Sequence, residues 1–192
     1  LIYPNAPQAT TLLQVMDHTK TPMGGRMLKR WLVAPLTDLK AIEKRLSVVT
    51  DFYQHSNRKQ RMQELLQSVG DLERLVAKVA TGRIGPRAIN QLKNTLLLIP
   101  KVTEITSQSD QEALRSLGEG LDSCSACCQW ITDRLSEDAP TQLGKGDTIA
   151  SGYSAELDDY RSIARDGKKI LDEMLERETE KTGISSLKIS FN

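Results

Sequence analysis

Apolar residues recur at steps of three and four along almost the whole chain, a spacing that places them on one face of an α-helix. Aromatic residues, which favour strands, make up only 4% of the 192 residues, whereas charged residues make up 27%. The pattern therefore predicts an all-α fold, a multi-helix bundle. A chain of this length can bury a core of its own.

Residues that favour helix ends divide this pattern into separate helices. Thr21 is expected to cap a helix that has Pro22 in its first position, and Asp38 is expected to cap the next helix. The longest predicted helix starts after Ser154 and ends at Thr182, with Gly183 as its C-terminal stop. At 1.5 Å per residue it would be roughly 43 Å long. Its apolar positions fade towards the C-terminal end, so we expect it to leave the core and project as a rod.

The most regular apolar run lies in the middle of the chain. It occupies Leu114, Leu117, Leu121, Cys124, Cys128, Ile131 and Leu135. Ser109 and Glu112 fit a capping box just before it. We therefore expect one long apolar seam there, despite the weakening effect of Gly118 and Gly120 on a helix.

The two ends of the chain suggest a piece of a longer protein. Residues 187–192 alternate apolar and polar side chains, as a half-buried strand does. A single strand cannot pair its own backbone groups, and position 1 is Leu rather than Met. We expect a short terminal strand whose partners belong to a missing part.

Charge and hydropathy limit the partners that the chain alone indicates. The formal net charge of +1 is not the basic signature of a nucleic-acid-binding domain. No apolar run approaches the roughly 18 residues that span a membrane, and no signal peptide is visible. We therefore expect a soluble, cytoplasmic protein without membrane contact.

The three cysteines form the sequence Cys124-Ser-Ala-Cys127-Cys128. A C-x-x-C pair can bind zinc or carry redox chemistry. A zinc site needs four ligands, however, and the two histidines, His18 and His55, lie far off without paired spacing. Two of the cysteines fall on the apolar seam, which favours buried structural thiols. We predict no metal site.

The stretch from Thr21 to Leu32, TPMGGRMLKRWL, places two glycines before basic residues and could suggest a phosphate cradle at a helix start. A Walker loop needs G-x-x-x-x-G-K-[ST] after a strand, and that spacing is missing here. The G-x-x-G at residues 82–85 lies between helical patterns and is better interpreted as a turn than as a KH module. Residues 152–154 lack the second glycine of a nucleophile elbow. We predict no catalytic and no cofactor-binding residue.

Four motifs spread over nearly the whole chain resemble the core-domain signature of the MutS family of DNA mismatch-repair proteins. The first motif is TPMGGRMLKRWL at residues 21–32 with the Pro-Leu at residues 35–36, and the second is Val69-Gly-Asp-Leu-Glu-Arg74. The third is IASGYSAELD at residues 149–158, and the fourth is RETEKTGISSLKISFN at residues 177–192. Members of this family are dimers that clamp around DNA. Their helical core, or lever, links an ATPase domain to the clamp.

The resemblance implies three segments. Residues 1–153 would be the helical core (lever) domain, residues 154–183 a long lever helix leading to the clamp, and residues 184–192 the first strand of a truncated clamp domain. The mismatch-reading Phe-x-Glu motif and the Walker signature belong to family domains that are missing here. The segment itself would therefore not be an enzyme, whereas the whole protein would be a DNA-dependent ATPase that uses ATP and Mg.

The resemblance also implies partners and two DNA-binding residues. The partners of the whole protein would be mismatch-containing double-stranded DNA, a second copy and a MutL-type protein, in a bacterial-type cytoplasm near the nucleoid. Asn192 would lie near the DNA backbone at the end of the first clamp strand, and Lys188 is a weaker candidate from its charge and position. Two alternatives stay open: a MutS paralogue with a role in recombination, and a helical interaction scaffold without a nucleic-acid role.

Overall fold

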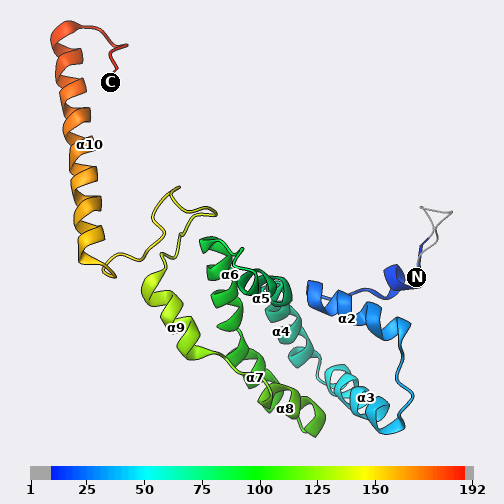
Figure 1. The fold of residues 1–192 in the computed structure, drawn as a ribbon. Coiled ribbons are helices and arrows are strands. Elements are labelled where there is room, and N and C mark those ends of the chain that lie inside the picture. The colour runs from blue at the N-terminus through cyan, green and yellow to red at the C-terminus, as the bar shows by residue number, and fades with distance from the viewer. Residues whose placement is uncertain (1–9, 189–192) are drawn as a thin grey trace. The chain divides into compact units, whose positions relative to one another are not determined.

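The computed structural model describes residues 10–188, apart from the side chain of Lys168 (Figure 1). The described residues are mostly helical and contain no sheet, so the all-α prediction is confirmed. The helices are α1 (Leu12–Met16), α2 (Pro22–Val33), α3 (Leu39–Gln54), α4 (Ser56–Gln67), α5 (Leu72–Ala80), α6 (Pro86–Leu96), α7 (Ile99–Ser107), α8 (Glu112–Glu119), α9 (Ser125–Arg134) and α10 (Ala155–Thr182). Within the described part, no helix combines the length and the apolar character that crossing a membrane requires.

The chain divides into two compact units. Residues 1–148 contain α1 to α9, and residues 149–192 contain α10. In the first unit, α7 packs against α8 and α4, α3 packs against α8 and α4, and α6 packs against α5 and α9. Most helices of this unit therefore pack on neighbours close in sequence, an arrangement built from short connections.

Two predicted caps of the first unit are confirmed. The Thr21 hydroxyl accepts the Gly24 N–H at 3.0 Å, and Pro22 occupies the first turn of α2. The Asp38 carboxylate accepts the Ala41 N–H at 2.8 Å and starts α3. Each side chain satisfies one of the N–H groups that a helix leaves unpaired at its beginning.

The prediction of one long apolar seam over residues 114–135 is wrong. The chain leaves the helix after Glu119 and resumes it at Ser125, with Cys124 in the left-handed conformation at φ 49°. Glycine is a poor helix former, and the Asp122 carboxylate accepts the Cys124 N–H at 2.8 Å, which competes with helical pairing. The 3-4 spacing continues across this break, but the helix does not.

The predicted capping box at Ser109 and Glu112 is also wrong. Gln111 is the N-cap residue of α8 and makes no side-chain cap. The Ser109 hydroxyl instead accepts the Gln111 N–H at 3.0 Å and donates to Asp51 at 2.6 Å. Ser109 is therefore bound to the buried Asp51 carboxylate of α3 and does not cap α8.

The apolar spacing that predicts helices along most of the chain gives little signal over helix α4. Its sequence, SNRKQRMQELLQ, is mostly polar, and Met62 is its one buried residue. A polar helix with a narrow apolar face gives little periodic signal. It forms here because it packs between α3 and α7.

The core of the first unit is small and mixed. Its buried apolar side chains are Met62, Leu75, Leu92, Ile105, Leu114, Cys128, Ile131 and Ala139. Nearly as many polar or charged side chains are buried with them: Asp51, Asn90, Lys93, Thr95, Thr106 and Ser109. The unit therefore depends on buried polar contacts as well as on apolar packing.

The second unit contains one uninterrupted helix. The Ser154 hydroxyl accepts the Leu157 N–H at 3.3 Å, and Gly183 ends α10 at φ 69°, so both predicted ends are confirmed. None of the described side chains of α10 is fully buried. The predicted terminal strand is not shown: residues 184–188 contain a turn at Ser185 and Ser186, and residues 189–192 lie outside the described part.

Candidate functional site

An ion-pair junction joins the N-terminal half of α2 to the N-terminal end of α5. Arg26 donates two hydrogen bonds to the Asp71 carboxylate, at 2.6 and 2.9 Å, and a third to Glu73 at 2.7 Å. Asp71 is also the N-cap of α5, where it accepts the Arg74 N–H at 3.3 Å. The bidentate geometry is the strong form of an arginine–carboxylate pair.

The junction changes the acid–base behaviour of both partners. Hydrogen bonds from Arg26 lower the pKa of Asp71 to about 2, and the two carboxylates raise the pKa of Arg26. In the folded protein, the Asp71 carboxylate therefore stays ionised to a lower pH than an ordinary aspartate does. Both residues lie inside the motifs quoted for the family resemblance, Arg26 in residues 21–32 and Asp71 in residues 69–74.

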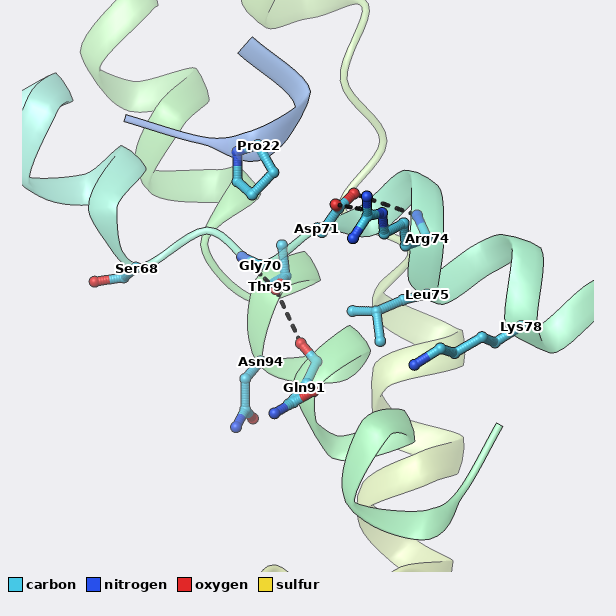
Figure 2. A pocket seen from close by; sticks show the side chains of 10 residues that line it. All are labelled: Pro22, Ser68, Gly70, Asp71, Arg74, Leu75, Lys78, Gln91, Asn94 and Thr95. Carbon is cyan, nitrogen blue, oxygen red and sulfur yellow. Dashed lines mark hydrogen bonds and ion pairs between the residues drawn. The ribbon is translucent and has the colours of Figure 1, made fainter. Parts of the chain in front are cut away.

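An open pocket of about 650 Å³ lies beside this junction (Figure 2). Pro22 stands at one side of it, and the side chains of Arg74, Lys78 and Asn94 surround it. The Thr95 hydroxyl at its floor accepts the Gly70 N–H at 3.1 Å and donates to the Gln91 carbonyl at 2.9 Å. The floor is therefore a structural contact between α6 and the turn before α5.

The two glycines of the opening stretch serve the start of α2. A Cβ atom on Gly24 would lie 3.1 Å from the Thr21 hydroxyl and 3.2 Å from Cβ of Thr19. The Gly24 and Gly25 N–H groups are already bonded to Thr21, one to its hydroxyl and one to its carbonyl. The glycines are thus explained by a tight capped turn, which agrees with the interpretation of this stretch as a helix start.

A buried cluster around Asp51 of α3 joins this helix to two other parts of the first unit. The Asp51 carboxylate, 1% exposed, accepts two hydrogen bonds from Arg58 of α4, at 2.5 and 2.6 Å, and one from Ser109 at 2.6 Å. Arg58 also donates to the Gln108 carbonyl at 2.5 Å. One carboxylate therefore holds α3, α4 and the turn between α7 and α8 together.

The same cluster keeps Asp51 charged although it is buried. Burial raises its pKa, but the hydrogen bonds from Arg58 and Ser109 and the charge of Arg58 outweigh that effect and lower it. The sequence pattern does not indicate this cluster. Asp51 lies off the apolar stripe of α3, and nothing in the spacing links it to Arg58 and Ser109. That stripe consists of Leu39, Ile42, Leu46, Val49 and Tyr53.

In the second unit, Asp158 fixes the loop that leads into α10. Its carboxylate accepts the Gly152 N–H at 2.6 Å and pairs with Arg161 at 3.1 Å. Arg161 donates to the Ile149 carbonyl at 2.9 Å. The third quoted motif, residues 149–158, is thus held by this carboxylate and arginine at the start of the long helix.

The structure separates the three cysteines by exposure. Cys124 and Cys127 are exposed, whereas Cys128 is buried at 3% exposure. For the two cysteines on the predicted seam, the prediction of a buried structural thiol is therefore correct for Cys128 and wrong for Cys124. Cys124 falls on the 3-4 spacing, but the break before α9 removes it from a packed face.

Of the two sequence-predicted DNA-binding residues, the structure describes Lys188 alone. Lys188 is exposed after the turn that follows α10. Asn192 lies outside the described residues. Their assignment stays a prediction.

These features define an all-α structural domain whose charged side chains join helices. The model of the family described as MutS domain III matches residues 2–188. Over its full length the chain is 49% identical to a DNA mismatch repair protein MutS from Christiangramia forsetii, of which it covers 22%. It is 47% identical over 97% of its length to the protein of the same name from Flavobacterium psychrophilum, covering 22% of it. The chain belongs to the MutS family, within its domain III.

The chain spans about a fifth of the length of these curated relatives. A third relative, from Flavobacterium johnsoniae, is 44% identical over 97% of the chain, and the chain covers 21% of it. The relatives are therefore much longer proteins than the matched region.

Proposed function

We propose that the chain is the core, or lever, segment of a MutS-type DNA mismatch-repair ATPase, and that α10 carries a change of position towards a DNA-gripping clamp. The observation that carries this proposal is the continuity of α10, a single helix of 28 residues from Ala155 to Thr182. The curated relatives share the name DNA mismatch repair protein MutS, which supports the repair role.

The physical basis is the stiffness of such a helix. At 1.5 Å per residue, 28 residues extend about 42 Å. The sequence of α10 contains no proline, so no residue removes a backbone hydrogen bond or forces a kink. A displacement of one end of α10 then also displaces the other end, because the helix does not kink in between.

The activity of the whole protein follows as part of the proposal. It would act as a DNA-dependent ATPase dimer that uses ATP and Mg, binds mismatched double-stranded DNA and meets a MutL-type partner in the bacterial cytoplasm. Lys188 and Asn192 would contact the DNA backbone. Contacts of that kind position a protein on DNA without reading its sequence.

A helical interaction scaffold is the second candidate, and one observation favours it. An apolar groove of about 410 Å³ on the first unit is lined by Trp31, Val49 and Leu117, each more than 40% exposed. Exposed apolar surface of this kind is typical of protein–protein contacts. A MutS paralogue with a role in recombination would share the lever. It would differ from a repair protein in the kind of DNA that the whole protein binds.

The test is a proline in the middle of α10 of the full-length protein. Ile170 is 57% exposed, so Ile170→Pro removes little packing but breaks the helix, and Ile170→Ala is the matched control. We expect Ile170→Pro to bind mismatched DNA but to lose the ATP-dependent release of that DNA. Hydrolysis of ATP without DNA is expected to stay at the wild-type rate.

DNA binding itself is measured over a range of salt concentrations with mismatched, matched and branched duplexes. A mismatch preference with a steep salt dependence supports the repair role. A preference for branched DNA would support the recombination alternative, and no DNA binding even at low salt would support the scaffold. Normal ATP-dependent release by Ile170→Pro would contradict the lever role.

A further inference from the structure

We propose that Cys124 and Cys127 form a thiol–disulfide pair that closes reversibly at the first turn of α9. Both side chains are exposed, and they are separated by two residues in the chain. The third cysteine, Cys128, is buried, and it donates from Sγ to the Ser123 carbonyl at 3.8 Å. The structure thus offers two accessible thiols next to one that is sequestered.

The backbone brings the two exposed cysteines within reach of each other. Cys124 is the N-cap of α9, and its carbonyl accepts the Cys128 N–H at 3.0 Å, so the first helical turn is closed around the pair. Residues three apart in a helix have Cα atoms roughly 5 Å apart. A disulfide requires a Cα separation of about 4.4–6.8 Å. The Cys124 side chain does not cap the N–H groups of α9, and its Sγ donates instead to the Asp122 carbonyl at 3.7 Å.

Burial makes Cys128 a poor partner for either thiol. It raises the pKa of Cys128, so less of the nucleophilic thiolate forms there. Cys128 also faces the core with Ile131, and both are buried on α9. A bond to Cys128 would need α9 to turn this face outward, whereas a bond between Cys124 and Cys127 leaves the packed face in place.

The chemistry is a two-electron thiol–disulfide exchange with a low-molecular-weight disulfide as oxidant. The thiolate of one cysteine attacks a sulfur of the oxidant, forms a mixed disulfide and releases one thiolate, which takes up a proton. The second cysteine loses its proton to solvent, attacks the cysteine sulfur of the mixed disulfide and releases the second thiol. The two cysteines are oxidised, the oxidant is reduced to two thiols, and a dithiol reductant reverses the reaction.

The experiment treats the whole protein with glutathione disulfide and maps the peptides under non-reducing conditions. All three cysteines lie in the tryptic peptide of residues 116–134, between Arg115 and the next arginine. We expect this peptide to become lighter by two hydrogen atoms, with fragment ions that place the bond between Cys124 and Cys127. Dithiothreitol is expected to restore the original mass.

Three variants test which sulfurs take part. Cys128→Ala keeps the pair and is expected to lose two hydrogen atoms as the wild type does. Cys124→Ser and Cys127→Ser each keep one exposed thiol and are expected to stop at a stable glutathione adduct. Circular dichroism checks that each variant is folded like the wild type, and thiol counting with a chromogenic disulfide in the folded state gives an independent measure.

Several outcomes would overturn the proposal. These are a wild-type peptide that keeps all its thiols, a peptide that carries glutathione on both exposed cysteines without closing, or a bond that includes Cys128. Loss of two hydrogen atoms in Cys124→Ser would overturn it as well, because the remaining thiols would then be pairing with each other.

Discussion

At the scale of single residues, a few charged side chains join helices of the first unit. Arg26 and Asp71 connect α2 with α5, and Asp51 connects α3 with α4 and with the turn before α8. Such pairs cost free energy to bury, and they hold together only when all their partners are present. Removing one partner should therefore have a larger effect than its few contacts suggest.

Asp51→Ala is expected to lower the free energy of unfolding by about 3–5 kcal/mol, because it leaves the Arg58 guanidinium, 13% exposed, without its carboxylate. Ser109→Ala removes one hydrogen bond to the same carboxylate and is expected to cost about 1.5–3 kcal/mol. Urea unfolding followed by circular dichroism measures both. Equal and small effects of the two variants would show that the cluster does not hold the helices together.

The Asp71 junction predicts a dependence of stability on pH. The folded-state pKa of Asp71, about 2, lies below the ordinary value of 3.8, so the carboxylate contributes stability above pH about 4 that is lost as the pH falls towards 2. Asp71→Asn and Arg26→Gln both remove this contribution. Each is expected to show a shallower decline of Tm over that range than the wild type, measured by thermal unfolding at a series of pH values. Parallel curves for all three proteins would exclude the junction as the cause.

At the scale of elements, close approach between helices depends on small residues at particular places. Helices α7 and α8 pack against each other at Gly118, where an added Cβ would collide with the Thr106 hydroxyl and lie 2.9 Å from Thr106 Cβ. Thr106 is itself buried, at 3% exposure, and has little room to move. The glycine that weakens the helix is thus what allows the helix pair to form.

Gly118→Ala is therefore expected to destabilise the protein by about 1–3 kcal/mol through overpacking. Gly120→Ala is the matched control, because a Cβ there would meet its nearest atoms at 3.5 and 3.8 Å, which is ordinary contact. The midpoint of urea unfolding distinguishes the two. A Gly118→Ala variant as stable as Gly120→Ala would mean that α7 and α8 can separate without cost.

In α10, by contrast, a glycine weakens the helix without allowing a close contact with another helix. Gly167 lies in the helix interior, and an added Cβ would meet nothing within 4 Å. Gly167→Ala is expected to stabilise α10 by about 0.5–1 kcal/mol, since alanine loses less backbone entropy in a helix. Gly183→Ala, at φ 69°, is expected to destabilise the C-terminal end by about 1–2 kcal/mol. Hydrogen exchange of the α10 amides measures both, and changes of the same sign would contradict this account.

The sequence predicted the elements whose ends carry local signals and missed contacts that arise only in three dimensions. Caps at Thr21, Asp38 and Ser154 use side chains that bond to their own helix, so a sequence pattern is enough to find them. The pairing of Asp51 with Ser109 spans 58 positions and leaves no periodic trace. The break before α9 was missed because apolar spacing continues through residues that are not helical.

At the scale of the whole molecule, the first unit presents many apolar side chains outside its small core. Trp31, Val49 and Leu117 line one groove, and Tyr53 is 83% exposed. The curated relatives are more than four times as long as the matched region. If other parts of the full-length protein cover this surface, the segment of residues 1–192 on its own should bind a hydrophobic dye such as ANS more strongly than the full-length protein does, per molecule. Equal dye binding would instead indicate that the groove stays open to outside partners.

The DNA-gripping end of the proposed lever makes a prediction about Lys188 in the full-length protein. If Lys188 contacts a phosphate, Lys188→Gln removes one released counterion, and the slope of log K against log salt should become shallower by about 0.9. The loss of affinity should be similar for mismatched and matched duplexes, because a phosphate contact carries no sequence information. Lys145→Gln, which removes one positive charge from an exposed loop of the first unit, controls for net charge and is expected to leave the slope unchanged. Equal slopes for the wild type and Lys188→Gln would place this lysine away from the DNA. An equal change of slope in Lys188→Gln and Lys145→Gln would show that overall charge, and not a phosphate contact, changes the slope.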